Sequence, residues 1–220
     1  MIKKLCCISL LSVCLLPCLV KAQVSYELPK KWEGKTEGET EGNPYVKNRV
    51  AVWRLDSIWP NKPEIKASSF VPMVWEKEKS EWRDLKNQQG GQPSAKVEDG
   101  NLSASSRGEW DGNPGQKLTS LAFINPSRGK YAVSGTVDLT VFDGNGEGAQ
   151  FLVVKKRKGS TKIEVVQAYP VSKTQNHLEL DTLVENLMPG DEIRFYLLFK
   201  KHHDAASWTI KDLKLTWKGP

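Results

Sequence analysis

Between Thr119 and Phe142, apolar and polar positions alternate with the two-residue period of a β-strand, interrupted by one tight turn. From Tyr131, apolar residues and Gly135 hold the odd positions through Val141, while small or polar residues hold the even ones. One face of this strand therefore suits a core and the other suits water. The pattern predicts that its odd-numbered side chains belong to the core and not to a site: Tyr131, Val133, Val137, Leu139 and Val141.

The chain after Lys117 keeps this rhythm. Seven strands are expected there: Leu118–Ile124, Tyr131–Phe142, Ala149–Lys156, Lys162–Ala168, His177–Val184, Glu192–Phe199 and Trp208–Trp217. Earlier strands are expected from Arg49 and at Phe70–Trp75, and only short ones fit the polar, glycine-rich stretch 76–116. Short strands separated by Gly, Pro, Asn and Asp predict an all-β fold, an antiparallel β-sandwich of jelly-roll-like type.

The first 22 residues have the pattern of a secretory signal peptide. Lys3 and Lys4 precede an apolar run from Leu5 to Val20, and small residues stand at the two positions that signal peptidase inspects. The run is shorter than the roughly 20 residues that a membrane-spanning helix needs. Lipidation at Cys18 is a weaker alternative, because proline precedes that cysteine. We therefore expect an exported protein, periplasmic or extracellular, beginning at Gln23.

Composition narrows the classes of function further. All four cysteines lie in the leader, so the exported chain has no disulfide and no thiolate metal site. The formal charge of +6 includes three leader lysines that no acid offsets. Basic residues elsewhere are scattered among acids, with 155–158 as the one dense run, so nucleic acid is not an expected partner.

The remaining chain divides into three parts. Residues 23–48 are rich in Lys, Glu, Gly and Thr, and we expect them to form a flexible charged tether. Residues 49–217 form a single β-sandwich domain, which is long enough to bury a sizeable core without covalent cross-links. Residues 218–220 are a C-terminal tail.

The order of these features resembles the jelly-roll-like β-sandwich modules of large secreted proteins of environmental bacteria. The matching elements are an early tryptophan strand at Trp53, the strand 70–75, segment 121–135, the glycine-rich hairpin at Asp143, segments 178–180 and 189–195, and a closing strand at Trp208. The resemblance covers 49–217, and the modules that this chain resembles are similar in architecture to carbohydrate-binding modules. It implies a binding or accessory role and supplies no catalytic residue.

Tryptophan supplies the first candidate binding residues, since indole rings pack against the C–H faces of sugars. Trp82 and Trp110 lie in the polar stretch 76–116 and Trp59 lies in an expected loop, so these three are candidate ligand platforms. The alternative is that they close the open ends of the sandwich. Trp53, Trp75, Trp208 and Trp217 lie on expected strands and are assigned to packing.

The other candidate sites, for a metal ion or for catalysis, have weaker support in the sequence. The segment Asp143–Glu147 has the alternating oxygen side chains of a calcium loop, but a hairpin turn explains it more simply. His202 with Asp204 could share one side of an extended chain, yet an exposed loop is favoured, and His177 is expected to be a polar strand end. No nucleophile, zinc or P-loop motif is present, so no catalytic residue, metal or cofactor is predicted.

Three hypotheses follow. The leading one is a non-catalytic glycan-binding β-sandwich whose partner is a polysaccharide or cell-envelope glycan. The second is a structural or adhesive envelope module with a flat apolar patch. The third is a small jelly-roll hydrolase or lyase, which requires a groove with two carboxylates or with Tyr, His and a cation converging. Carboxylates such as Glu109, Asp111, Glu179 and Asp181 have no spacing that identifies such a pair.

Overall fold

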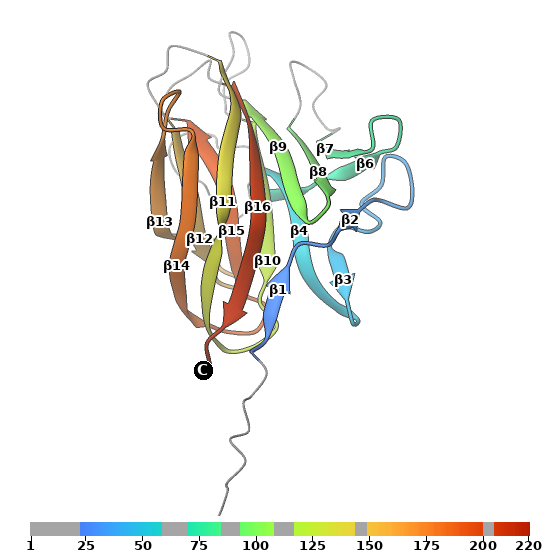
Figure 1. Cartoon of the computed structure of the whole chain (residues 1–220). Helices are drawn as coiled ribbons and strands as arrows, with labels where there is room; N and C mark the ends of the chain where they lie inside the picture. Colours follow the sequence, from blue (N-terminus) through green and yellow to red (C-terminus); the bar gives the residue numbers. More distant parts are fainter. Residues whose placement is uncertain (1–22, 59–69, 85–92, 108–116, 144–148, 200–204) are drawn as a thin grey trace, which may run out of the picture.

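The computed structural model describes residues 23–58, 70–84, 93–107, 117–143, 149–199 and 205–220, which form two antiparallel sheets packed face to face (Figure 1). The all-β sandwich class is therefore confirmed. Among the described residues there is no helix, and hence none with the length and apolarity that crossing a bilayer requires.

Sheet A has nine strands, and its main path runs β14-β11-β16-β9-β8-β7-β6, with β1 beside β16 and β2 beside β8. Its strands are β1 (Ser25–Glu27), β2 (Lys31–Trp32), β6 (Val74–Glu76), β7 (Glu81–Arg83), β8 (Ser94–Glu98), β9 (Asn101–Arg107), β11 (Gly129–Asp143), β14 (His177–Leu187) and β16 (Ala205–Trp217).

Sheet B has seven strands in the order β13-β12-β15-β10-β4-β3, with β5 also paired to β4. Its strands are β3 (Tyr45–Lys47), β4 (Val50–Ile58), β5 (Phe70–Pro72), β10 (Leu118–Ile124), β12 (Ala149–Lys156), β13 (Ile163–Val171) and β15 (Glu192–Phe199). The bounds of β10, β12 and β15 match the sequence-based prediction.

Strand β11 follows the predicted alternation. Tyr131, Val133, Val137 and Leu139 are buried between the sheets, and Ser134 and Thr140 on the opposite face are exposed. At Gly135 the register with β16 shifts, so that two residues, Asp212 and Leu213, stand opposite one. A Cβ at Gly135 would lie 3.0 Å from the carbonyl oxygen of Lys211, and the residue has a positive φ of 149°. Glycine is therefore required at this bulge.

The segment predicted as one strand at Phe70–Trp75 is two strands in different sheets. β5 pairs with β4 in sheet B, and β6 pairs with β7 in sheet A. Between them, Met73 is fully buried and its backbone N–H donates to the carbonyl of Leu55 at 3.0 Å. The chain thus changes sheet at Met73. The apolar run is continuous because this crossing lies in the core.

The prediction that 23–48 is a flexible tether is wrong. β1 pairs with β16 and β2 pairs with β8, so this segment extends sheet A. Asn43 is buried, and its amide donates to the carbonyls of Leu55 at 2.7 Å and Met73 at 3.0 Å and accepts from the Leu55 N–H at 3.0 Å. Low hydrophobicity argued for disorder, but hydrogen bonds from one buried amide hold the polar stretch to the sandwich.

Candidate functional site

Trp82 is not an exposed platform. Its side chain has 0% exposure and lies in the core, with ring centroids 6.0 Å from Trp32 and 5.3 Å from Trp75. The indole N–H of Trp82 donates to the Trp32 carbonyl at 3.0 Å, and that of Trp32 donates to the Gly42 carbonyl at 2.8 Å. This burial contradicts the candidate role of Trp82 and favours the packing alternative, because no sugar can reach either ring face.

The other two predicted platforms, Trp59 and Trp110, lie outside the described residues, and so do residues 144–147 of the candidate calcium loop and the segment with His202 and Asp204. The tryptophans assigned to packing are buried at Trp53, Trp75 and Trp208, whereas Trp217 is half-buried. Within the ranges that the structure describes, no group of three or more His, Cys, Asp or Glu side chains could hold a metal ion.

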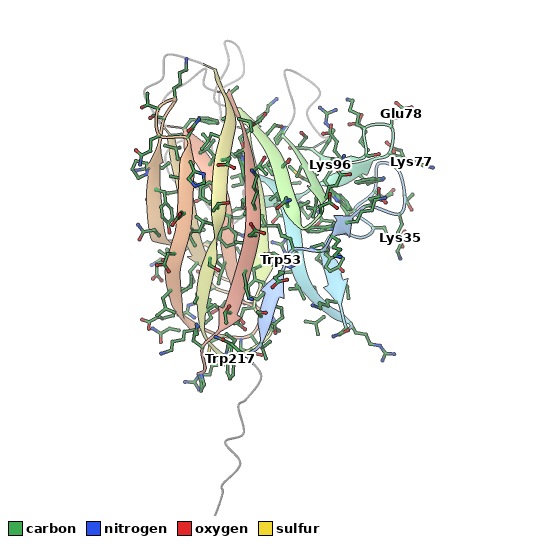
Figure 2. All side chains as sticks on the ribbon, in the orientation of Figure 1. Lys35, Trp53, Lys77, Glu78, Lys96 and Trp217 are labelled. Atoms are coloured by element: carbon green, nitrogen blue, oxygen red, sulfur yellow. The ribbon has the colours of Figure 1, made fainter. Side chains whose placement is uncertain are left out.

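An open cleft of about 610 Å³ lies at the end of the sandwich where β11 begins and β14 ends. We call it the basal cleft. Figure 2 labels Trp217 at this end, which is also the end where the C-terminus lies, far from Lys77 and Lys96 on the side of the molecule. The residues lining the basal cleft are Arg128, Gly129, Lys130, Arg157, Glu185, Asn186, Leu187, Met188 and Pro220.

A β-bulge shapes one wall of the basal cleft. β11 and β14 pair Gly129 with Leu187 and then Tyr131 with Val184, so Lys130 stands opposite two residues, Glu185 and Asn186. Asn186 has a positive φ of 56°, a conformation that asparagine tolerates better than most residues. Bulges redirect side chains at the ends of sheets, and this one brings Lys130, Glu185 and Asn186 to the same opening.

The opposite wall depends on Gly129. A Cβ there would lie 2.3 Å from the carbonyl oxygen of Gly219 and 2.6 Å from the indole nitrogen of Trp217, and φ is 143°. Without a side chain at 129, the C-terminal segment packs directly on the turn. The Lys130 N–H donates to the Gly219 carbonyl at 3.0 Å, and the Trp217 indole donates to the Arg128 carbonyl at 3.1 Å. The backbone that carries both cations is therefore held in place.

Asp191 fixes the floor of the basal cleft. Its carboxylate accepts the backbone N–H groups of Lys158 and Met188, each at 2.9 Å, and a bond from Arg157 Nη1 at 2.7 Å. Arg157 also donates to the carbonyl of Asn186. Burial would raise the pKa of Asp191, but these bonds outweigh it and the pKa is lowered. Asp191 therefore remains ionised and ties β12 to the turn before β15.

The cations of the cleft differ in what they already bind. Arg157 is engaged by Asp191 and Asn186, as described above. Arg128 is exposed and Lys130 is half-buried, and neither side chain has a hydrogen bond or ion pair with any other residue in the described part of the chain. Glu185 is the one carboxylate of the lining. The basal cleft thus offers two available cations beside Met188, a residue that is 49% exposed.

A second charged cluster lies on the outer face of sheet B. Arg194 has 0% exposure, and its guanidinium donates to Asp56 at 2.7 Å and to Glu192 at 2.6 Å, with the Phe70 ring centroid 3.6 Å from its central carbon. Arg54 bonds both oxygens of Asp56 at 3.0 Å and one of Glu192 at 3.2 Å. We call these five residues the sheet B network. Its two positive charges balance its two negative charges, and each guanidinium lies within ion-pair distance of both carboxylates, so we assign it to stability.

Acid should destabilise the protein through these carboxylates. Burial would raise the pKa of Glu192, but Arg194, Arg54 and Lys156 outweigh it, and the pKa of Glu192, like that of Asp191, is lowered in the folded state. A carboxyl with a lowered folded pKa contributes stability above its unfolded pKa and loses it as the pH falls through the folded value. We therefore expect the Tm to be flat near neutrality and to fall below about pH 4.5.

Thermal unfolding at a series of pH values measures this effect. Glu192→Gln should lower the Tm at neutral pH and make its further decline in acid shallower than in the wild type. An equally steep acid decline in Glu192→Gln would show that other groups control it.

Among the other titratable groups that the sequence singled out, His177, Glu179 and Asp181 lie on the outer face of sheet A, whereas Glu109 and Asp111 lie outside the described residues. His177 Nδ1 lies 2.6 Å from Asp138 Oδ1, and Lys211 Nζ lies 2.8 Å from Asp138 Oδ2. The hydrogen bonds from Lys211 and His177 lower the pKa of Asp138. Glu179 and Asp181 are exposed on β14, and neither lines the basal cleft. These groups form a solvated cross-strand row, and His177 stands at a strand start as predicted.

Comparison with known proteins yields only distant structural similarity. No family model matches the chain, and no curated protein matches it. The CBM22-1 xylan-binding domain of Xyn10C from Paenibacillus barcinonensis is similar at 14% identity and a TM-score of 0.40, over 90% of this chain and 95% of that one. A CBM29-2 mutant complexed with mannohexaose has 14% identity and a TM-score of 0.36, over 74% and 92%.

A third similar structure belongs to an enzyme. Isomalto-dextranase from Arthrobacter globiformis, complexed with panose, has 13% identity and a TM-score of 0.32, over 68% of this chain and 22% of that one. All three TM-scores lie below 0.5 and the identities are 13 to 14%, so these similarities carry no argument about the family or the ligand of this chain.

Proposed function

We propose that this protein is an exported, non-catalytic β-sandwich that binds glycans in the basal cleft. The supporting observation is the composition of this opening. Met188 offers an exposed apolar surface for the C–H face of a sugar ring, while Asn186, Glu185 and Lys130 offer donors and acceptors for its hydroxyl groups. Open clefts that combine these two kinds of surface fit carbohydrates, which are amphipathic ligands.

Binding rather than hydrolysis fits the lining of the cleft. Most glycoside hydrolases use two carboxylates on either side of the scissile bond. Among the residues that line the basal cleft, Glu185 has the one acidic side chain, and the nearby Asp191, bonded to the lining residues Arg157 and Met188, is already engaged by three donors. The signal-peptide pattern of residues 1–22 supports export to a compartment where polysaccharides are accessible.

Affinity electrophoresis of the purified protein in gels that contain neutral or acidic polysaccharides tests this function. At least one polysaccharide should retard the wild type. Met188→Ser should weaken that interaction by about tenfold, because it removes the apolar contact to the sugar ring. The matched control is Val165→Ser on β13, where the side chain is 55% exposed but lies outside the cleft. Equal retardation of Met188→Ser and wild type would exclude the basal cleft as the binding site.

A further inference from the structure

We propose that the ligand of the basal cleft is an acidic polysaccharide, whose carboxylate or sulfate groups bind Arg128 and Lys130. This inference rests on the proposed function and makes its ligand class specific. Arg128, Lys130 and Arg157 line the cleft with one acidic side chain, Glu185, and Asp191 pairs with Arg157, so cationic side chains outnumber acidic ones at this opening. A neutral sugar has no group that matches this excess of cations.

The two available cations point to an anion that the protein does not itself supply. Arg157 already donates hydrogen bonds to the Asp191 carboxylate and to the Asn186 carbonyl. Some other cations of the chain have protein partners, such as Lys211 with Asp138 and Arg83 with Glu76, and exposed lysines without one in the described part of the chain, such as Lys47, do not line the cleft. Arg128 and Lys130 have none among the described residues. Hydrogen bonds from charged donors to an oxyanion are stronger than those to a neutral hydroxyl.

The positions of these cations are set before a ligand arrives. Both backbone groups of Lys130 are bound, since its N–H donates to the Gly219 carbonyl at 3.0 Å and its carbonyl accepts from Lys218 at 2.9 Å. The Arg128 carbonyl is held by the Trp217 indole. Asp191 holds the floor through Lys158, Met188 and Arg157. A fixed backbone lowers the entropic cost of binding, although the side-chain ends still have to order.

The size of the charged area favours a polysaccharide over other polyanions. Nucleic-acid sites combine a stripe of cations with aromatic stacking surfaces, and membrane-binding surfaces gather four to eight basic residues in one cluster. Two available cations in a cleft of about 610 Å³ fit a polysaccharide that carries about one charge per sugar ring. Arginine presents paired donors that match either a carboxylate or a sulfate.

The test compares three ligands with one charge-removing variant. Binding of the wild type to polygalacturonate, dextran sulfate and neutral dextran is measured by isothermal titration calorimetry at low and high salt. We expect binding to one or both acidic chains, weaker at high salt, and a loss of at least about tenfold in Arg128→Gln/Lys130→Gln. The preference between the first two ligands distinguishes a carboxylate from a sulfate.

Lys47→Gln/Lys77→Gln is the matched control, because it removes two exposed charges outside the cleft and should bind as the wild type does. An equal loss in this control would show non-specific attraction and overturn the inference. Binding of neutral dextran that Arg128→Gln/Lys130→Gln leaves intact would overturn it while sparing the proposed function. Binding to anionic phosphatidylserine vesicles with no binding to any polysaccharide would overturn both. Melting curves of each variant confirm that it is folded.

Discussion

Asp56→Ala is expected to lower the free energy of unfolding by about 3 to 5 kcal/mol, because it leaves the fully buried Arg194 without one of its two carboxylate partners. Urea unfolding at pH 7, monitored by tryptophan fluorescence, measures this loss. The remaining carboxylate of the sheet B network, Glu192, would then face both Arg54 and Arg194, and one guanidinium would stay buried with incomplete neutralisation.

The double variant Asp56→Ala/Arg194→Leu separates two explanations of that loss. If the penalty comes from a stranded charge, removing the guanidinium as well should recover part of the stability, since buried ion pairs are often replaceable by apolar residues. Lys96→Ala removes an exposed pair with Glu98 and should cause no measurable change. A double variant less stable than Asp56→Ala would mean that Arg194 stabilises the protein mainly through other contacts, such as that with the Phe70 ring.

Trp82→Ala is expected to cost a similar amount, about 3 to 5 kcal/mol, because it opens a cavity between Trp32 and Trp75. It also leaves the Trp32 carbonyl without the indole donor. Chemical unfolding measures the loss. Trp82→Phe keeps much of the ring but not the N–H, so the difference between the two variants estimates the contribution of packing.

Trp217→Ala is the comparison for Trp82, because that indole is half-buried at the surface and its removal should cost less. Glycan binding by folded Trp82→Ala, measured well below its melting temperature, should equal that of the wild type. A variant of normal stability with lost binding would instead restore Trp82 as a ligand platform.

The sequence predicted the second half of the fold well for a physical reason. Strands β10, β12 and β15 each adjoin a turn segment rich in Gly, Pro, Asn or Asp, and β11 alternates strictly, so local signals mark them. The first half is held by non-local contacts. Asn43 bonds to Leu55 and Met73, and β1 pairs with the last strand of the chain. Composition alone cannot reveal such contacts, and the segment 23–48 therefore has the composition of a tether.

The candidate site was harder to predict than the core. An indole ring can serve either as a sugar platform or as a core residue, and the sequence does not distinguish the two. Trp82 is a core residue, because its large apolar area is fully buried. The basal cleft joins Arg128, Arg157 and Glu185, which are far apart in the sequence and meet only through strand register. One local signal was present. The turn segments 125–129 and 188–191, rich in Asn, Pro, Gly and Asp, mark the loops that form the opening.

The position of β16 bears on when the chain can fold. This strand lies between β11 and β9 and also pairs with β1, yet it follows every one of them in the sequence. Until residue 217 has been synthesised, β14 and β11 have no connection within sheet A to β9, β8, β7 and β6. The completion of sheet A therefore depends on a strand that is made after every strand it joins, so β14 with β11 and β9 with β8 must remain separate pieces until β16 docks between them.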